Sequence, residues 1–413
     1  MNCRATLLVV LACLSIAGSV TSASAEPIDV SQLEWSVAAL IDQSREPFPE
    51  SEPVNLPGQF NSPRDMRGMA ISPNGRYLYV GYNNSIAGPL PDGDRQGEVR
   101  RIDLTVTGPN KFDTQWSGRE LGNRGKAIAV DDVGRVYLAD AGRIDVYNAD
   151  LSSKLFTIDR PANTNFNWEG VAVKREGGNL MLYVSDRQNG TLAKAQLTEF
   201  GATITAATPV ASFGVGGIKL LANTAASLRN VEIDGNGNIW VAGKDNNTLY
   251  RVSPNGSVVQ SATITNPFDI GFNGTQVFVT HQNQRVLSVF EISQFENNTI
   301  PTIASGIAPP WAALNIDSNG NEETQSPGLL SGIVVLPGRG FFLGNENGQT
   351  QGQKSLYGVT DLFSGNGFQD NFFDDNEPVF FAALPVPEPA ACVLALTALV
   401  AFGGYARRQK RHS

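Results

Sequence analysis

Charged residues recur at the first position of a short strand that is repeated along the chain. The residues at this position are Arg67, Lys126, Glu169, Arg229, Phe268 and Ser331. Three cations and one carboxylate brought to one place would form a receptor for an anionic or sugar-like ligand. The same charges would also suit a structural role, in which Glu169 pairs with the cations and makes their burial tolerable. The sequence leaves both interpretations open.

Several other chemistries are excluded by the residue types present. His281 is the only histidine before the basic C-terminal tail, and the cysteines Cys3, Cys13 and Cys392 all lie near the ends of the chain. A histidine-rich zinc centre, a Cys–His dyad and a disulfide framework therefore have no residues to build them. The formal net charge of −9 disfavours a nucleic-acid-binding protein, which would need a cationic surface.

The charged position belongs to a unit of two strands joined by a polar turn, and this unit occurs six times. The units cover residues 67–80, 126–138, 169–184, 229–241, 268–279 and 331–343. Their Gly-containing turns supply the positive φ of a tight hairpin, and a closed ring buries sheets that cannot bury both faces alone. We predict an all-β, six-bladed β-propeller over residues 61–380. Its repeated first positions would then meet at the mouth of the central channel.

Two further segments have expected places in this ring. Residues 26–60 contain one predicted strand, Leu33 to Ile41, which would pair with the last blade and close the ring. His281 occupies the position that Asp140 and Asp186 hold in other units, so we expect it to have a turn role.

The repeats resemble those of NHL and SMP-30/gluconolactonase-like propellers, and the stretch from Leu228 to Gly243 follows their pattern most fully. SMP-30-like enzymes hold a divalent cation, usually calcium, at the channel mouth with Glu, Asn and Asp from different blades. The resemblance implies a calcium site of Glu169, Asn230 and Asp269, and a hydrolase in which Glu169 is the catalytic carboxylate. Asn230 and Asp269, however, come one residue later in their strands than Glu169 does. Such a shift turns a side chain to the opposite face, unless a bulge restores its direction.

The N-terminus carries a targeting pattern. Residues 1–25 combine Arg4, an apolar run and the small residues Ala23 and Ala25. This order is typical of a secretory signal peptide that signal peptidase removes. We therefore expect the protein to be exported.

The C-terminus carries a second targeting pattern. Residues 381–389 form a spacer that contains Pro387, Glu388 and Pro389, and residues 390–413 are an apolar segment with a basic end. An apolar helix followed by cations would hold the chain in the membrane before processing. The order of these parts resembles the PEP-CTERM sorting signal of Gram-negative bacteria, and the resemblance implies processing by an exosortase. It places the protein in the cell envelope, on the surface or in the extracellular matrix.

Two functions from different classes follow from these patterns. The first is a non-enzymatic binding protein at the cell surface, whose channel mouth at Arg67, Lys126, Glu169 and Arg229 recognises an extracellular protein or polysaccharide. It requires no cofactor. The alternative is a calcium-dependent hydrolase of lactones or phosphoesters.

Overall fold

The computed structural model describes most of the central part of the chain. The described residues are 27–32, 34–39, 64–84, 98–104, 125–140, 142–161, 164–222, 226–282, 284, 286–307, 313–316, 322–325, 329–338, 340–346 and 379–383. Among them, nearly all regular structure is strand. The signal-peptide residues Ala23 and Ala25, the motif Pro387, Glu388 and Pro389, and the predicted helix at 390–413 lie outside this set.

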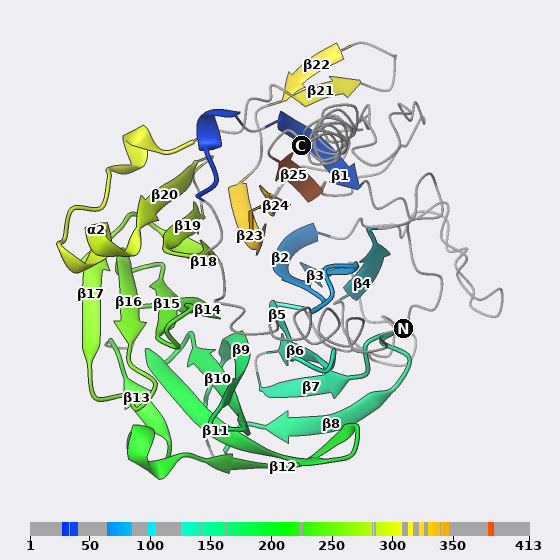
Figure 1. Cartoon of the computed structure of the whole chain (residues 1–413), viewed down its shortest axis with the longest axis vertical. Helices are drawn as coiled ribbons and strands as arrows, with labels where there is room; N and C mark the ends of the chain where they lie inside the picture. The colour runs from blue at the N-terminus through cyan, green and yellow to red at the C-terminus, as the bar shows by residue number, and fades with distance from the viewer. Residues whose placement is uncertain are drawn as a thin grey trace, which may run out of the picture.

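Six sheets of three to five strands stand around a central axis (Figure 1). The first three sheets consist of β2 (Arg64–Ile71), β3 (Tyr77–Asn84) and β4 (Glu98–Asp103); β5 (Ala127–Val130), β6 (Val136–Asp140), β7 (Arg143–Tyr147) and β8 (Lys154–Asp159); and β9 (Trp168–Glu176), β10 (Asn179–Asp186), β11 (Thr191–Phe200), β12 (Thr203–Pro209) and β13 (Ile218–Leu220). The next three consist of β14 (Leu228–Ile233), β15 (Ile239–Gly243), β16 (Thr248–Val252) and β17 (Val259–Thr263); β18 (Pro267–Asn273), β19 (Gln276–His281) and β20 (Leu287–Glu291); and β1 (Glu34–Ala39), β25 (Val379–Ala383), β24 (Gly340–Glu346) and β23 (Leu329–Leu336).

Smaller elements join or flank these sheets. They are the hairpin of β21 (Ala313–Ile316) and β22 (Glu322–Gln325), the helix α2 (Ile292–Glu296), and the 3-10 helices η1 (Val30–Gln32), η5 (Ala211–Phe213) and η6 (Ile303–Ser305). Among the described residues, no helix has both the length and the apolar character needed to span a membrane.

The first strands of the six units are innermost and form a closed cycle. β2 contacts β5, and the contacts continue through β9, β14, β18 and β23, which contacts β2 again. Each sheet therefore has a neighbour on both faces, as a closed ring requires. The predicted all-β propeller is confirmed.

The last sheet combines strands from both ends of the described chain. β1 pairs antiparallel with β25, and β25 pairs with β24. The strand expected at Leu33 to Ile41 is β1, and it is the outermost strand of this sheet. One predicted boundary needs correction, because β25 continues through Ala383 with full pairing on both sides. Residues 381–383 therefore belong to the propeller and not to the spacer.

Large aromatic side chains fill the spaces between sheets. The second strands of the units contribute the fully buried Tyr79, Tyr137, Tyr183, Trp240, Phe278, Phe341 and Phe342. The hairpin turns before these strands contain Gly75, Gly134, Gly237, Gly274 and Gly338, all at positive φ, as the turn chemistry predicts. Burial of these rings and the local turn preference act together to fix each hairpin.

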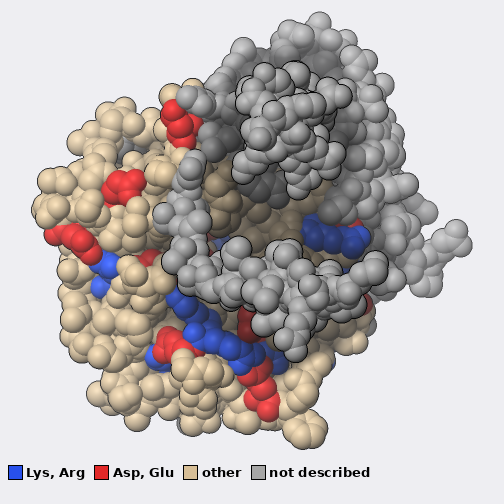
Figure 2. Space-filling view, in the orientation of Figure 1, with Lys and Arg blue, Asp and Glu red and all other residues tan. Residues whose placement is uncertain are grey.

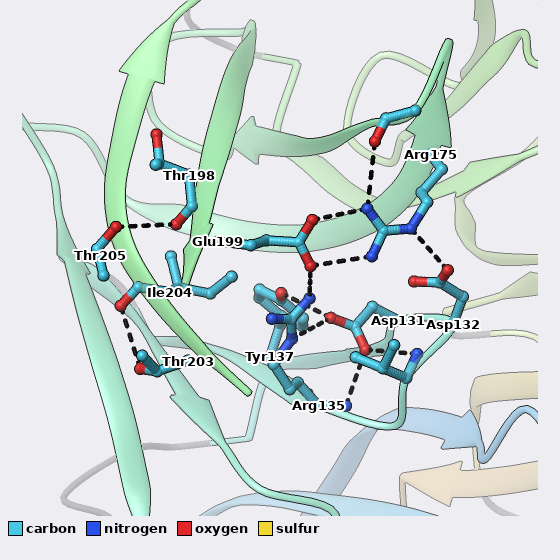
Figure 3. A network of polar contacts seen from close by, with 12 residues as sticks. Asp131, Asp132, Arg135, Tyr137, Arg175, Thr198, Glu199, Thr203, Ile204 and Thr205 are labelled. Carbon is cyan, nitrogen blue, oxygen red and sulfur yellow. Dashed lines mark hydrogen bonds and ion pairs between the residues drawn. The ribbon is translucent and has the colours of Figure 1, made fainter. Parts of the chain in front are cut away.

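One end of the ring carries the hairpin turns between the first and second strands, and we call it the turn end. Charged side chains at this end join neighbouring sheets. Figure 3 shows Glu199 between two arginines: Arg135 Nη2 donates to Glu199 Oε1 at 2.5 Å, and Arg175 Nη1 donates to Oε2 at 2.6 Å. Arg135 Nε also pairs with Asp131 at 2.6 Å, and Arg175 Nε pairs with Asp132 at 2.7 Å. Here two cations are paired with three carboxylates. Charges of both signs are likewise interleaved over β6, β9 and β10 on the face that Figure 2 presents.

Candidate functional site at the hub

The repeated first position lies at an irregularity of the backbone. In five of the six described sheets, the pairing register between the first and second strands shifts at this position. The shifts fall between Met66 and Gly68, Trp168 and Gly170, Leu228 and Val231, Pro267 and Ile270, and Leu330 and Ile333. A bulge re-aims the side chain of the extra residue. The same local device therefore turns Arg67, Glu169 and Arg229 away from the regular pleat.

Hydroxyl groups on the second strands support these irregularities. Gly170 N donates to Ser185 Oγ at 2.9 Å, and Ser185 Oγ donates to the carbonyl of Arg229 in the next sheet. In the sheet of β18, Asp269 N donates to Thr280 Oγ1 at 3.0 Å. Each hydroxyl satisfies a backbone N–H that the regular ladder would otherwise leave unpaired.

Charged side chains from three other sheets converge on Glu169. Arg67 Nη1 donates to Glu169 Oε1 at 2.9 Å, and Arg229 Nη1 donates to the same oxygen. Lys126 Nζ donates to Glu169 Oε2 at 3.0 Å. The structure thus brings together the four residues that the repeat predicted as a ligand-binding set. We call Arg67, Lys126, Glu169 and Arg229 the hub cluster.

The two remaining first-position residues also belong to the hub. The guanidinium carbons of Arg67 and Arg229 lie 5.9 Å and 5.4 Å from the centre of the Phe268 ring. Ser331, on β23, is fully buried, and its Oγ has no hydrogen-bond partner among the described residues. Phe268 therefore forms an apolar side of the hub. Ser331 contributes a buried hydroxyl group that has no hydrogen-bond partner among the described residues.

Burial and charge together set the protonation of the hub cluster. The side chains of Glu169 and Arg229 are each 3% exposed, Lys126 is 5% exposed and Arg67 is 11% exposed. Burial alone would raise the pKa of Glu169, but Arg229, Lys126 and Arg67 outweigh it and lower that pKa to about 2. Burial lowers the pKa of Arg229, and the Glu169 carboxylate opposes this effect. Glu169 is consequently ionised at neutral pH, and three positive charges face its single negative charge.

Sequence reasoning missed two residues beside the hub cluster. Asn167 Oδ1 accepts a hydrogen bond from Lys126 Nζ at 3.2 Å. Arg187 follows the last residue of β10, and its backbone N–H donates to the Asn167 carbonyl at 2.9 Å. The charge of Arg187 acts on both Glu169 and Arg229. Neither residue occupies the repeated first position, so the alignment of units gave no signal for them.

The structure does not assemble the predicted calcium set. Asn230 Nδ2 donates to Asp269 Oδ1, which also accepts from Ile270 N at 2.7 Å, while Asp269 Oδ2 accepts from Ile333 N at 2.8 Å. Asp269 therefore links three neighbouring innermost strands, and Glu169 is occupied by cations instead of joining it. Within the described ranges, no group of three or more His, Cys, Asp or Glu side chains is placed to hold a metal. The residues present do not fit a calcium ion.

The environment of Asp269 differs from that of Glu169. Asp269 is fully buried among backbone donors with no cation among its partners, and burial raises its pKa to about 7. The pKa of the neighbouring Glu232 is also raised to about 7, first by burial and then by the charge of Asp269. The hub thus contains one carboxylate held ionised by cations and two whose charge is disfavoured.

His281 and Trp168 have structural surroundings. His281 ends β19 as Asp140 ends β6 and Asp186 ends β10, and its ring contacts the Thr265 carbonyl and Ser288 Oγ. Trp168 is buried in the core between the sheets of β5 and β9. Both side chains are enclosed by protein.

Comparison with known proteins bears on the fold. No protein-family model matches the chain, and no curated protein matches its sequence. Similar solved structures include virginiamycin B lyase from Staphylococcus aureus, at 11% identity and a TM-score of 0.43, covering 79% of this chain and 97% of that one. They also include regucalcin, described as a calcium-binding protein, from Agrobacterium tumefaciens, at 9% identity and a TM-score of 0.43, covering 80% and 96% of the two chains. Similarities this distant do not indicate what this chain does, because proteins that share a fold can differ in function.

Proposed function

We propose that this chain is an exported binding protein that recognises an acidic extracellular polysaccharide at the hub of its propeller. The observation that carries the proposal is the convergence of three cations, Arg67, Lys126 and Arg229, on the single carboxylate of Glu169 at the hub. Several cations held together in this way would bind an anionic ligand through charge-assisted hydrogen bonds. By contrast, Arg135 and Arg175 are matched by the three carboxylates of Asp131, Asp132 and Glu199 elsewhere in the fold.

Binding is better supported than hydrolysis. A general base acts best when its pKa lies near the working pH, and the pKa of Glu169 is far below neutrality. Both oxygens of Glu169 already accept hydrogen bonds from cations. The calcium-dependent alternative also needs Asn230 and Asp269 at the same ion, and these two residues bond to each other instead.

The two ends of the chain support the proposed location. Signal peptidase would cleave after Ala25, and an exosortase would act at Pro387, Glu388 and Pro389. The apolar segment at 390–413 would hold the chain in the membrane until then. A protein delivered in this way meets the polysaccharides of the surface and matrix of a Gram-negative-type bacterium.

A binding measurement with a charge-deleting variant tests the proposal. We expect the full chain to bind polygalacturonate and not neutral dextran in calorimetric titration. Arg67→Gln should weaken binding about tenfold or more, because a hydrogen bond between charged groups is worth ~1.5–3 kcal/mol. Arg67 is the most exposed cation of the hub cluster, so a ligand reaches it first. Binding should also weaken as salt is raised, since salt screens charge.

Arg76→Gln is the matched control. Arg76 belongs to the same sheet but pairs with Asp103 at the opposite end, where its side chain is 47% exposed. We expect wild-type affinity from this variant. Absence of polygalacturonate binding, or equal losses in Arg67→Gln and Arg76→Gln, would contradict the proposal.

A further inference from the structure

Arg187 is presented to the hub by a rigid turn. Its backbone N–H is bonded to the Asn167 carbonyl, and Asn167 also holds Lys126 of the hub cluster. The end of β10 is held as well, because Asp186 still pairs with Trp168 beyond the register shift. The position of Arg187 beside the hub is therefore set by two strands of one sheet.

The guanidinium of Arg187 has no partner among the described residues. It is half-buried, and it forms no hydrogen bond, ion pair or ring contact within the described ranges. The adjacent carboxylate of Asp186 is engaged elsewhere, since its Oδ1 accepts from Asn167 N and Gln188 N, both at 2.9 Å. By contrast, Arg135, Arg175 and Arg251 each form ion pairs.

The surroundings of Arg187 make this lack of a partner unfavourable. Arg187 brings a fourth positive charge to the three cations that meet at Glu169. The positive charge of Arg187 lowers the pKa of both Glu169 and Arg229, so the guanidinium lies near both side chains. A half-buried cation in such a field is stabilised by an anion that comes from outside the chain.

We propose that Arg187 is the residue that pairs with the ligand, and that it takes the ring carboxylate of an acidic sugar in a two-point ion pair. This inference rests on the proposed function and assigns the ligand class within it. Arg67, the least buried cation of the hub cluster, lies beside the bound carboxylate. Lys126 and Arg229 are positioning residues, because Glu169 holds both of them in place.

The carboxylate class follows from the geometry of the side chain. A planar guanidinium matches a planar carboxylate with two parallel N–H···O bonds, whereas a lysine supplies only a point charge. Guanidinium–carboxylate pairing already occurs in the hub, since Arg67 and Arg229 each donate one hydrogen bond to Glu169 Oε1. The ligand carboxylate would bind on the outer side of the same cations.

Calorimetric titration of the full chain with trigalacturonate tests the inference. Arg187→Gln should weaken binding about tenfold or more, and Arg187→Lys should restore part of the loss because it keeps only the charge. Arg160→Gln is the matched control for general charge, since Arg160 is exposed and its side chain donates to the Phe166 carbonyl. We expect that variant to bind within about twofold of wild type.

Thermal unfolding separates binding from a structural role. Because the guanidinium of Arg187 has no protein partner in the described ranges and lies near other cations, Arg187→Gln should leave the unfolding midpoint unchanged or raise it while affinity falls. Wild-type affinity in Arg187→Gln would overturn the inference but leave the hub proposal standing. Failure of the wild type to bind any acidic sugar would overturn the proposed function itself. Tighter binding of a sulfated trisaccharide than of trigalacturonate would overturn the carboxylate assignment.

Discussion

At the scale of single residues, Glu169 has the largest structural consequence. Its carboxylate accepts hydrogen bonds from cations of three other sheets, and all four side chains are almost fully buried. Removing one member of a buried ion pair costs ~3–5 kcal/mol, because it leaves uncompensated charge in the interior. The stability of the hub therefore depends on one negative charge.

Glu169→Gln should lower the free energy of unfolding by ~3 kcal/mol or more at pH 7, as measured by chemical denaturation. The pH dependence should change as well. The pKa of Glu169 is depressed from 4.5 to about 2, so its contribution is present above pH 4.5 and is lost as the pH falls toward 2. The variant lacks this contribution, and we expect it to lose less stability than wild type over that interval.

Glu296→Gln provides the comparison for this experiment. Glu296 pairs with Arg251 at 2.5 Å, but its side chain is 45% exposed. Exposed ion pairs contribute ~0–1 kcal/mol. Equal destabilisation by the two substitutions would show that Glu169 is an ordinary surface partner.

Sequence reasoning found some residues of the site and missed others for a physical reason. Arg67, Lys126 and Glu169 share one position of a repeated unit, and ring closure necessarily brings equivalent positions together. Arg187 lies in a turn after the second strand, and only the fold carries that turn to the hub. Glu169 bonds to cations, whereas Asn230 and Asp269 bond to each other. These partners come from neighbouring sheets, and an alignment of units cannot show which partner each side chain finds.

At the scale of elements, the innermost strands approach one another at glycine. Gly170 follows the bulged Glu169 on β9, and a Cβ placed on it would lie 2.7 Å from Ser185 Oγ and 2.8 Å from Asn230 Cα. Such distances are too short for carbon atoms, so β9 and β14 can pack this closely only without a side chain at that position.

Gly170→Ala should therefore destabilise the protein by ~2 kcal/mol, because overpacking forces the two strands apart. Gly235→Ala is the matched control, since no atom lies within 4 Å of a Cβ built there. We expect it to change the free energy of unfolding by less than ~0.5 kcal/mol. A stability loss of the same size in both variants, measured by urea unfolding, would show that the close approach of β9 and β14 is not what requires glycine.

The hairpins could be predicted from sequence, whereas the bulges could not. Alternating strands around a Gly-containing turn form a local pattern, and the positive φ of Gly75, Gly134 and Gly237 agrees with it. The bulges depend on Ser185 and Thr280, whose hydroxyls lie on other strands and bond to the next sheet. No local pattern in β9 or β18 contains that information.

At the scale of the whole molecule, the hub exists only because the ring is closed. Its charges come from β2, β9 and β14 and from Lys126 just before β5, and none of these elements alone brings them together. Closure also uses the N-terminal segment, since β1 completes the last sheet and Ile28 is buried against it. Export would deliver this closed ring to the polysaccharides that we propose it binds.

A crystal structure of the protein with bound trigalacturonate tests the central claim most directly. The account predicts a sugar carboxylate within hydrogen-bond distance of the guanidinium groups of Arg187 and Arg67, with Glu169 still bound to Lys126 and Arg229. Sugar bound on the outer strands or at the turn end of the ring, with the hub unchanged and empty, would contradict it.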